Sequence, residues 1–244
     1  IAGGADTGID DHEDLRGVVL GPTGVDRKQH GTAVAGIAAA IGNNGIGMAS
    51  VNDRGRFLRV LDYPALAGQL PSADDVADAL FKAVDDDASV VLMAFSSDGP
   101  VPSIMKEAVR HARDAGLVLV AAAGNEGGGA GRRWPANIDG VVVVTALDGD
   151  RLATFSTHGG PDAIGAPGVA VCAPTPGGGY QEQDGSSMAA ALVAGAVGRR
   201  RAECPRESGR STEAALQATS RGLYDVGPRR LRVDALLEWP CSSR

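Results

Sequence analysis

The stretch Gly185-Ser186-Ser187-Met188-Ala189-Ala190-Ala191 opens an uninterrupted run of small and apolar residues that continues to Val197. Such a run indicates a buried helix and places serine on its first turn. Backbone N–H groups at a helix start are unpaired and carry the positive end of the helix dipole, so a developing oxyanion on a serine there can be stabilised. The alternative is that Ser186 and Ser187 simply cap the helix.

Length and composition limit the class of protein. A chain of 244 residues is long enough for one large domain or two small ones with a substantial core. Its net charge of −7 argues against nucleic acid as the main partner. No apolar run approaches the roughly 18 residues of a membrane span, and no charged-then-apolar signal segment opens the chain. Because the first residue is Ile1, we expect a processed product or an excised domain.

The three cysteines, Cys172, Cys204 and Cys241, have no metal-ligand spacing. Cys204 and Cys241 could form a disulfide if the protein is exported. Buried free thiols are the other interpretation.

Continuous apolar segments at 90–95 and 117–123 alternate with segments of helical periodicity at 72–86 and 103–115. Strands that are apolar on both sides are typical of a parallel sheet covered by helices. We therefore predict an α/β fold with a doubly wound, mostly parallel central sheet and helices on both faces. Further strands are expected at 56–61, 141–146, 153–156 and 169–173, and further helices at 33–41, 212–219 and 233–239.

Four polar residues stand at the ends of these predicted elements. Asp6 follows the apolar segment 1–5, His30 precedes a buried helix, Asn125 follows a buried strand, and Ser187 starts a helix. Each alone has a structural explanation, such as a turn aspartate. Together they supply what a nucleophilic serine needs: a base, a carboxylate that orients the base, and an oxyanion donor.

Six segments then resemble the subtilisin-like serine proteases, the subtilase family, across nearly the whole chain. They are DTGID from Asp6, HGTAVAG from His30, AAAGNEG from Ala121, APG from Ala166, GSSMA from Gly185 and RVDA from Arg232. The resemblance implies a serine endopeptidase acting through an acyl-enzyme intermediate. It implies that Asp6 orients His30, that His30 serves as base and then acid, and that Ser187 attacks the scissile carbonyl. The amide of Asn125 and the N–H of Ser187 would hold the oxyanion.

The resemblance also implies how a peptide or protein substrate binds, namely as an added strand. One edge is placed on Ser97-Asp98-Gly99, with a shift of one residue left open. A wall of the pocket for the residue before the cut would come from Ala122, Ala123 and Gly124. Because Asp98 and Glu126 are acidic, we hypothesise a preference for basic substrate residues.

A calcium site is implied by the similarity of Asp14 and the loop at 42–48 to the family's strong site. Its ligands would be the side chains of Asp14 and Asn44 and the carbonyls of Gly42, Ile46 and Met48. These are about five oxygens, whereas calcium takes 6 to 8. The family's remaining ligand comes from an N-terminal arm, so a metal-free tight turn is the alternative.

The sequence departs from the family pattern in three places. Ser186 replaces threonine, Ala191-Leu192 replace Pro-His, and the usual N-terminal arm and propeptide do not precede Asp6. We expect a single peptidase domain over residues 1–244, which a propeptide or inhibitor could bind. Two alternatives stay open: a peptide-binding pseudoprotease, and a processing enzyme that passes the acyl group to an amine. Export is common in the family.

Overall fold

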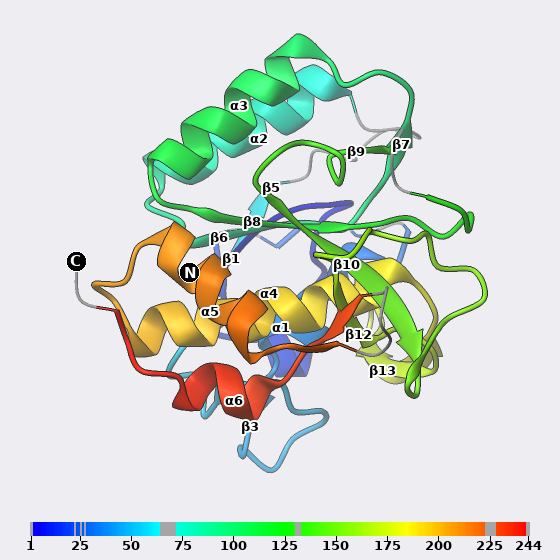
Figure 1. Cartoon of the computed structure of the whole chain (residues 1–244). Helices are drawn as coiled ribbons and strands as arrows, with labels where there is room; N and C mark the ends of the chain where they lie inside the picture. Colours follow the sequence, from blue (N-terminus) through cyan, green and yellow to red (C-terminus); the bar gives the residue numbers. More distant parts are fainter. Residues whose placement is uncertain are drawn as a thin grey trace.

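The computed structural model describes residues 2–21, 23–24, 26, 28–63, 72–129, 133–222 and 228–242. A ten-stranded sheet crosses the molecule (Figure 1). Across it lie β15 (Arg221–Gly222), β16 (Arg229–Arg230), β12 (Ile164–Pro167), β10 (Val141–Asp148), β8 (Val118–Ala122), β6 (Val90–Met93), β1 (Ala2–Ala5), β5 (Val60–Tyr63) and β2 (Val19–Leu20), with β11 (Arg151–Leu152) beside β10. All pairs are parallel except β15 with β16 and β10 with β11.

Helices cover both faces of the sheet, which confirms the predicted doubly wound α/β fold (Figure 1). One face packs against α2 (Ala73–Asp85) and α3 (Ser103–Asp114), and the other against α1 (Gly31–Ala39), α4 (Ser186–Glu203), α5 (Gly209–Thr219) and α6 (Val233–Glu238). The central strands β6 and β8 are buried along their whole length, as their continuous apolar sequence predicts.

Smaller elements lie outside these layers. They are the 3-10 helix η1 (Glu13–Leu15) and three two-stranded pairs: β3 (Ile41–Gly42) with β4 (Asn52–Asp53), β7 (Ser97–Asp98) with β9 (Arg133–Trp134), and β13 (Val171–Pro174) with β14 (Tyr180–Gln183). None of the described helices is long and apolar enough to cross a membrane.

Three predicted boundaries differ from the structure. The strand expected at 56–61 is β5 at Val60–Tyr63, because the N–H groups of Gly55 and Arg56 bond back to the carbonyls of Asn52 and Asp53 in a turn. The strand expected at 153–156 is instead the short β11, because the chain turns at 149–150 and pairs back on β10. The helix expected at 212–219 begins earlier, at Gly209, because the Ser208 hydroxyl accepts a hydrogen bond from the Ser211 N–H and caps it.

Small residues allow α1 and α4 to pack closely. A side chain at Gly195 of α4 would come within 2.5 Å of the Ala38 carbonyl of α1, and one at Gly36 would come within 2.2 Å of Pro174. Helix α4 is therefore buried through most of its length and fixes the position of Ser187 on its first turn.

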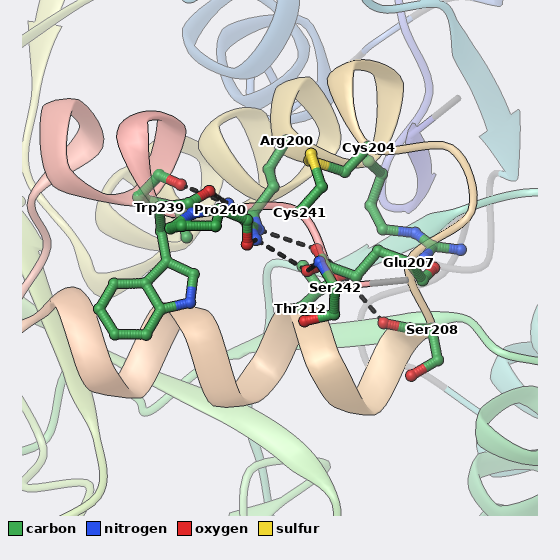
Figure 2. The surroundings of a disulfide bond; sticks show 11 residues. Arg200, Cys204, Glu207, Ser208, Thr212, Trp239, Pro240, Cys241 and Ser242 are labelled. Atoms are coloured by element: carbon green, nitrogen blue, oxygen red, sulfur yellow. Dashed lines mark hydrogen bonds and ion pairs between the residues drawn. A yellow bond between two sulfur atoms is a disulfide. The ribbon is translucent and has the colours of Figure 1, made fainter. Parts of the chain in front are cut away.

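The other end of α4 is held by a buried ion pair and a disulfide (Figure 2). Arg200 is 1% exposed and donates to both carboxylate oxygens of Glu207, at 2.8 and 2.7 Å. Its guanidinium also donates to the carbonyls of Leu236, Trp239 and Pro240. Beside it, Cys204 and Cys241 form the disulfide that the sequence left open, with 5.5 Å between their Cα atoms. Cys172 is a free and exposed thiol.

Candidate active site

Asp6 and His30 are joined by a short hydrogen bond. Asp6 follows the carboxyl end of β1 and is 4% exposed, and His30 stands at the start of α1. Its Nδ1 lies 2.7 Å from Asp6 Oδ1. Burial lowers the pKa of His30, but the hydrogen bond and charge of Asp6, with the charge of Asp26, outweigh burial and raise this pKa above its usual value.

A second carboxylate, Asp26, organises the turn that carries His30. It is 3% exposed and accepts hydrogen bonds from the Thr7 hydroxyl and the Thr32 N–H, both at 2.8 Å. Gly31 has no side chain to block the approach, since a Cβ there would lie 2.1 Å from the Gly8 carbonyl oxygen. Sequence reasoning missed Asp26, although its place four residues before His30 was the available signal.

A third carboxylate, Asp62, is the next-to-last residue of β5. It accepts a hydrogen bond from the Ile9 N–H at 3.1 Å. Burial, assisted by the charges of Asp6 and Asp26, raises the pKa of Asp62 to about 6. This group therefore changes charge near neutral pH, close to the Asp6–His30 pair.

Ser187 lies on the first turn of α4 and is 7% exposed. Its hydroxyl donates to the carbonyl of Ala94, at 2.8 Å, just after β6. Within the described part of the chain, no hydrogen bond joins Ser187 to His30. The structure thus brings Asp6 and His30 together, and it holds the Ser187 hydroxyl on a backbone carbonyl that sequence reasoning did not identify.

Asn125 faces the helix start that carries Ser187. Its side-chain oxygen accepts a hydrogen bond from the Ser186 N–H at 2.8 Å, which turns its amide nitrogen the other way. The point where a Cβ of Gly185 would stand lies 3.4 Å from that nitrogen and 3.7 Å from the Ser187 nitrogen. Both nitrogens therefore lie close to one point at the helix start, and their role as oxyanion donors stays a prediction.

The predicted substrate wall lies beside these donors. Ala122 is the last residue of β8, and Ala123 and Gly124 follow it and lead into Asn125. Gly124 has φ +111°, and a Cβ there would stand within about 3 Å of three polar side chains. They are Glu126 (2.9 Å), Ser96 (3.0 Å) and Thr157 (3.0 Å).

The substrate edge predicted at Ser97-Asp98-Gly99, with a shift of one residue left open, stays a prediction. Ser97 and Asp98 form β7 and pair with Trp134 and Arg133 of β9, and Gly99 follows them. The segment that meets Ser187 and Gly124 is Ala94–Ser96, a little earlier in the chain. Small residues gave no sequence signal there. Glu126 also has a partner that the sequence did not indicate, because Arg133 lies 3.0 Å from its carboxylate.

Asp14, the first of the predicted calcium ligands, is fully buried in η1. Its Oδ2 accepts hydrogen bonds from the Met48 N–H (3.1 Å) and the Tyr180 hydroxyl (2.7 Å), whereas its Oδ1 is buried without a partner among the described residues. The Asn44 side chain accepts from the Ile46 N–H, and the Gly42 carbonyl accepts from the Arg54 N–H. The described residues contain no group of three or more His, Cys, Asp or Glu side chains that could hold a metal. The unpartnered Asp14 oxygen nevertheless has the hard-ligand chemistry of calcium, and the bond from the Met48 N–H brings the loop at 42–48 to Asp14.

Comparisons with known proteins indicate the family of the chain. The family model described as the subtilase family matches residues 5–234. The chain is 40% identical over 202 residues to a thermophilic serine proteinase of Bacillus sp. (strain AK1), covering 78% of this chain and 49% of that protein. It is 36% identical over 206 residues to thermitase of Thermoactinomyces vulgaris, covering 79% of this chain and 71% of that protein.

A solved structure points to the same fold. The crystal structure of fervidolysin from Fervidobacterium pennivorans, titled a keratinolytic enzyme related to subtilisin, is 28% identical with a TM-score of 0.84. The match covers 100% of this chain and 43% of that one. The chain spans about half the length of several of the proteins that it matches. It belongs to the subtilase family, as the six sequence segments predicted.

Proposed function

We propose that this chain is a serine endopeptidase that hydrolyses peptide bonds through Asp6, His30 and Ser187. The observation that carries the proposal is the 2.7 Å bond between Asp6 and His30 Nδ1, because it leaves Nε2 as the imidazole nitrogen available to a nucleophile. Family membership supports the same reaction class.

The proposed mechanism starts with a rotation of the Ser187 hydroxyl away from the Ala94 carbonyl and toward His30. His30 Nε2 takes the hydroxyl proton as Oγ attacks the scissile carbonyl carbon, and Asp6 stabilises the imidazolium. The carbonyl oxygen becomes an oxyanion between the Asn125 amide and the Ser187 N–H. His30 then gives its proton to the leaving amine. Water, deprotonated by His30, hydrolyses the acyl-enzyme and frees Ser187.

The substrate would bind in extended form along the segment from Ala94 to Gly99, with the wall at Ala122, Ala123 and Gly124 facing the residue before the cut. The hypothesis of a basic preference now depends mainly on Asp98, because Arg133 offsets the charge of Glu126. Cleavage profiling with a peptide library checks it, and a profile without basic enrichment contradicts it.

We also propose that calcium binds at the Asp14 loop. Asp14 Oδ1 would hold it with the Asn44 side chain and the carbonyls of Gly42, Ile46 and Met48, and the ion would fix this loop without taking part in catalysis. Calcium should then raise the melting temperature of the wild type and leave Asp14→Asn unchanged. The Asp11→Asn variant, which alters an exposed carboxylate nearby, should respond as the wild type does. If the wild type melts at the same temperature in calcium and in chelator, the site is a metal-free turn.

One observation favours a second function, that of a peptide-binding pseudoprotease. The Ser187 hydroxyl is bonded to Ala94 instead of His30, and a serine locked there would not be activated. Transfer of the acyl group to an amine uses the same three residues, so product masses with and without an added amine are needed to separate it from hydrolysis.

A fluorophosphonate serine probe with peptide mapping separates the first two functions. We expect the label on Ser187 in the wild type and none in Ser187→Ala. The Ser186→Ala variant is the matched control, since it removes the neighbouring hydroxyl that accepts from the Gly124 N–H and keeps the nucleophile. Folded, calcium-supplied wild type that takes no label would favour the peptide-binding function.

A further inference from the structure

A cavity of about 530 Å³ lies along α3, bounded by the segment at 137–139 and the first turn of α5. The end of α3 and this segment lead into the amino ends of β8 and β10. The candidate catalytic residues Asp6 and Asn125 instead follow the carboxyl ends of β1 and β8. The cavity is therefore separate from the active site, and nothing in the proposed reaction uses it.

Four cationic side chains line this cavity. Lys106, Arg110 and Arg113 are spaced four and three residues apart, so they share one face of α3. Arg210 enters from α5, because Gly209 lets that helix approach closely: a Cβ there would be 2.6 Å from the Gly116 carbonyl oxygen. Helices far apart in the chain thus bring their charges to one place.

Arg113 is held in a fixed position at the cavity. Its guanidinium occupies the space where a side chain of Gly140 would stand, only 2.1 Å from that glycine's ideal Cβ position. Its Nη2 also donates a hydrogen bond of 3.1 Å to the carboxylate of Glu213 on α5. Its Nε is buried and has no acceptor among the described residues.

The charges in the cavity do not balance. Two lining carboxylates, Asp114 and Asp139, face the four cations. Asp114 lies 3.6 Å from Arg110 and 3.8 Å from Arg210, beyond hydrogen-bonding distance, and both arginines are largely exposed. Even with Glu213 counted, one positive charge remains in excess, in a chain whose net charge is −7.

From these observations we infer that this cavity binds a small multiply charged oxyanion, of the phosphate or polycarboxylate class. Arginine presents a planar fork of N–H donors that matches the oxygens of phosphate and carboxylate groups. Arg110 and Arg210 make no close hydrogen bond with Asp114, so together they favour a ligand with several oxygens. The volume falls in the range of small-molecule sites. Val109 and Ile138 give the cavity an apolar part that can contact the uncharged portion of a ligand.

Isothermal titration of the full chain with pyrophosphate and with citrate tests the inference, each at constant ionic strength. We expect saturable binding of at least one probe to one site, weakened by added sodium chloride. Arg110→Gln and Arg210→Gln should each weaken it about tenfold, since each removes a charge-assisted donor. Both side chains are exposed, so their melting temperatures should match the wild type.

Arg232→Gln is the matched control, because it makes the same charge change at the start of α6, where Arg232 pairs with Asp234. Its affinity for the probe should stay within twofold of the wild type. Binding of pyrophosphate alone would assign the phosphate class, and binding of citrate alone would assign the polycarboxylate class. No saturable heat with either probe, or equal weakening in Arg232→Gln, would overturn the inference. None of these results depends on peptidase activity.

Discussion

At the scale of single residues, the most informative group is the set of carboxylates near His30. Asp6 accepts a hydrogen bond from the imidazole of His30, and the negative charge of Asp26 also raises the pKa of His30. Asp62 lies close enough to Asp6 and Asp26 for their charges to raise the pKa of Asp62. A base surrounded in this way is more easily protonated than a free histidine.

The pH dependence of the reaction should report this environment. Protonated His30 cannot accept the Ser187 proton, so kcat/KM should fall as the pH drops through the raised pKa of His30. Removing one negative charge with Asp26→Asn should lower this pKa and move the fall to lower pH. Asp74→Asn, at the exposed start of α2, should leave the profile in place. A profile that moves equally in both variants would rule out a specific effect of Asp26.

The amide of Asn125 should affect the rate more than binding. We expect Asn125→Ala to lower kcat by about 10²- to 10³-fold with little change in KM, because the lost donor acts on charge that develops only in the transition state. Steady-state kinetics measure both terms. A change confined to KM would mean that Asn125 binds the ground state instead.

At the scale of elements, Asp6 and Asn125 follow strands β1 and β8, and the carboxyl ends of parallel strands meet at one edge of a sheet, whereas His30 and Ser187 stand at the starts of helices α1 and α4. Ala94 and Ser96 were not predictable, because their role depends on contacts with segments far along the chain and small residues carry no local signal. The substrate edge at Ser97–Gly99 stays a prediction, and the structure adds that Ser97 and Asp98 pair with β9.

The contact between α1 and α4 allows a test of this packing. Gly195→Ala should lower the free energy of unfolding by about 1–3 kcal/mol, because the new methyl group meets the rigid Ala38 backbone at 2.5 Å. Gly198→Ala on the same helix should cost less, since its methyl group meets only the end of the Leu58 side chain, which can move. Urea denaturation of both variants gives the comparison. Equal costs would show that backbone contact is not what limits this interface.

At the scale of the whole molecule, Arg200 connects the helix that carries Ser187 to the last helix of the chain (Figure 2). We expect Arg200→Met to lower the free energy of unfolding by about 3–5 kcal/mol, because it leaves the Glu207 carboxylate buried without its main partner. Arg199→Met, next to it, should cost about 1 kcal/mol or less, since its pair with Glu203 is partly exposed. Chemical denaturation with the disulfide intact measures both. Similar costs would mean that the buried pair adds no stability of its own.

The disulfide gives a chemical signature of the intact fold. A thiol reagent should modify one cysteine per native chain, Cys172, because Cys204 and Cys241 are paired. Mass mapping after modification identifies the site. Modification of all three without prior reduction would show that the disulfide is not formed in the purified protein.

The bonds of Arg200 to Leu236, Trp239 and Pro240 have a consequence for limited proteolysis. A protease cuts a segment that can be drawn into an extended conformation. Here the carbonyls of these three residues are engaged by one buried guanidinium. An added protease should therefore cut the segment 236–240 only after the cluster around Arg200 has opened.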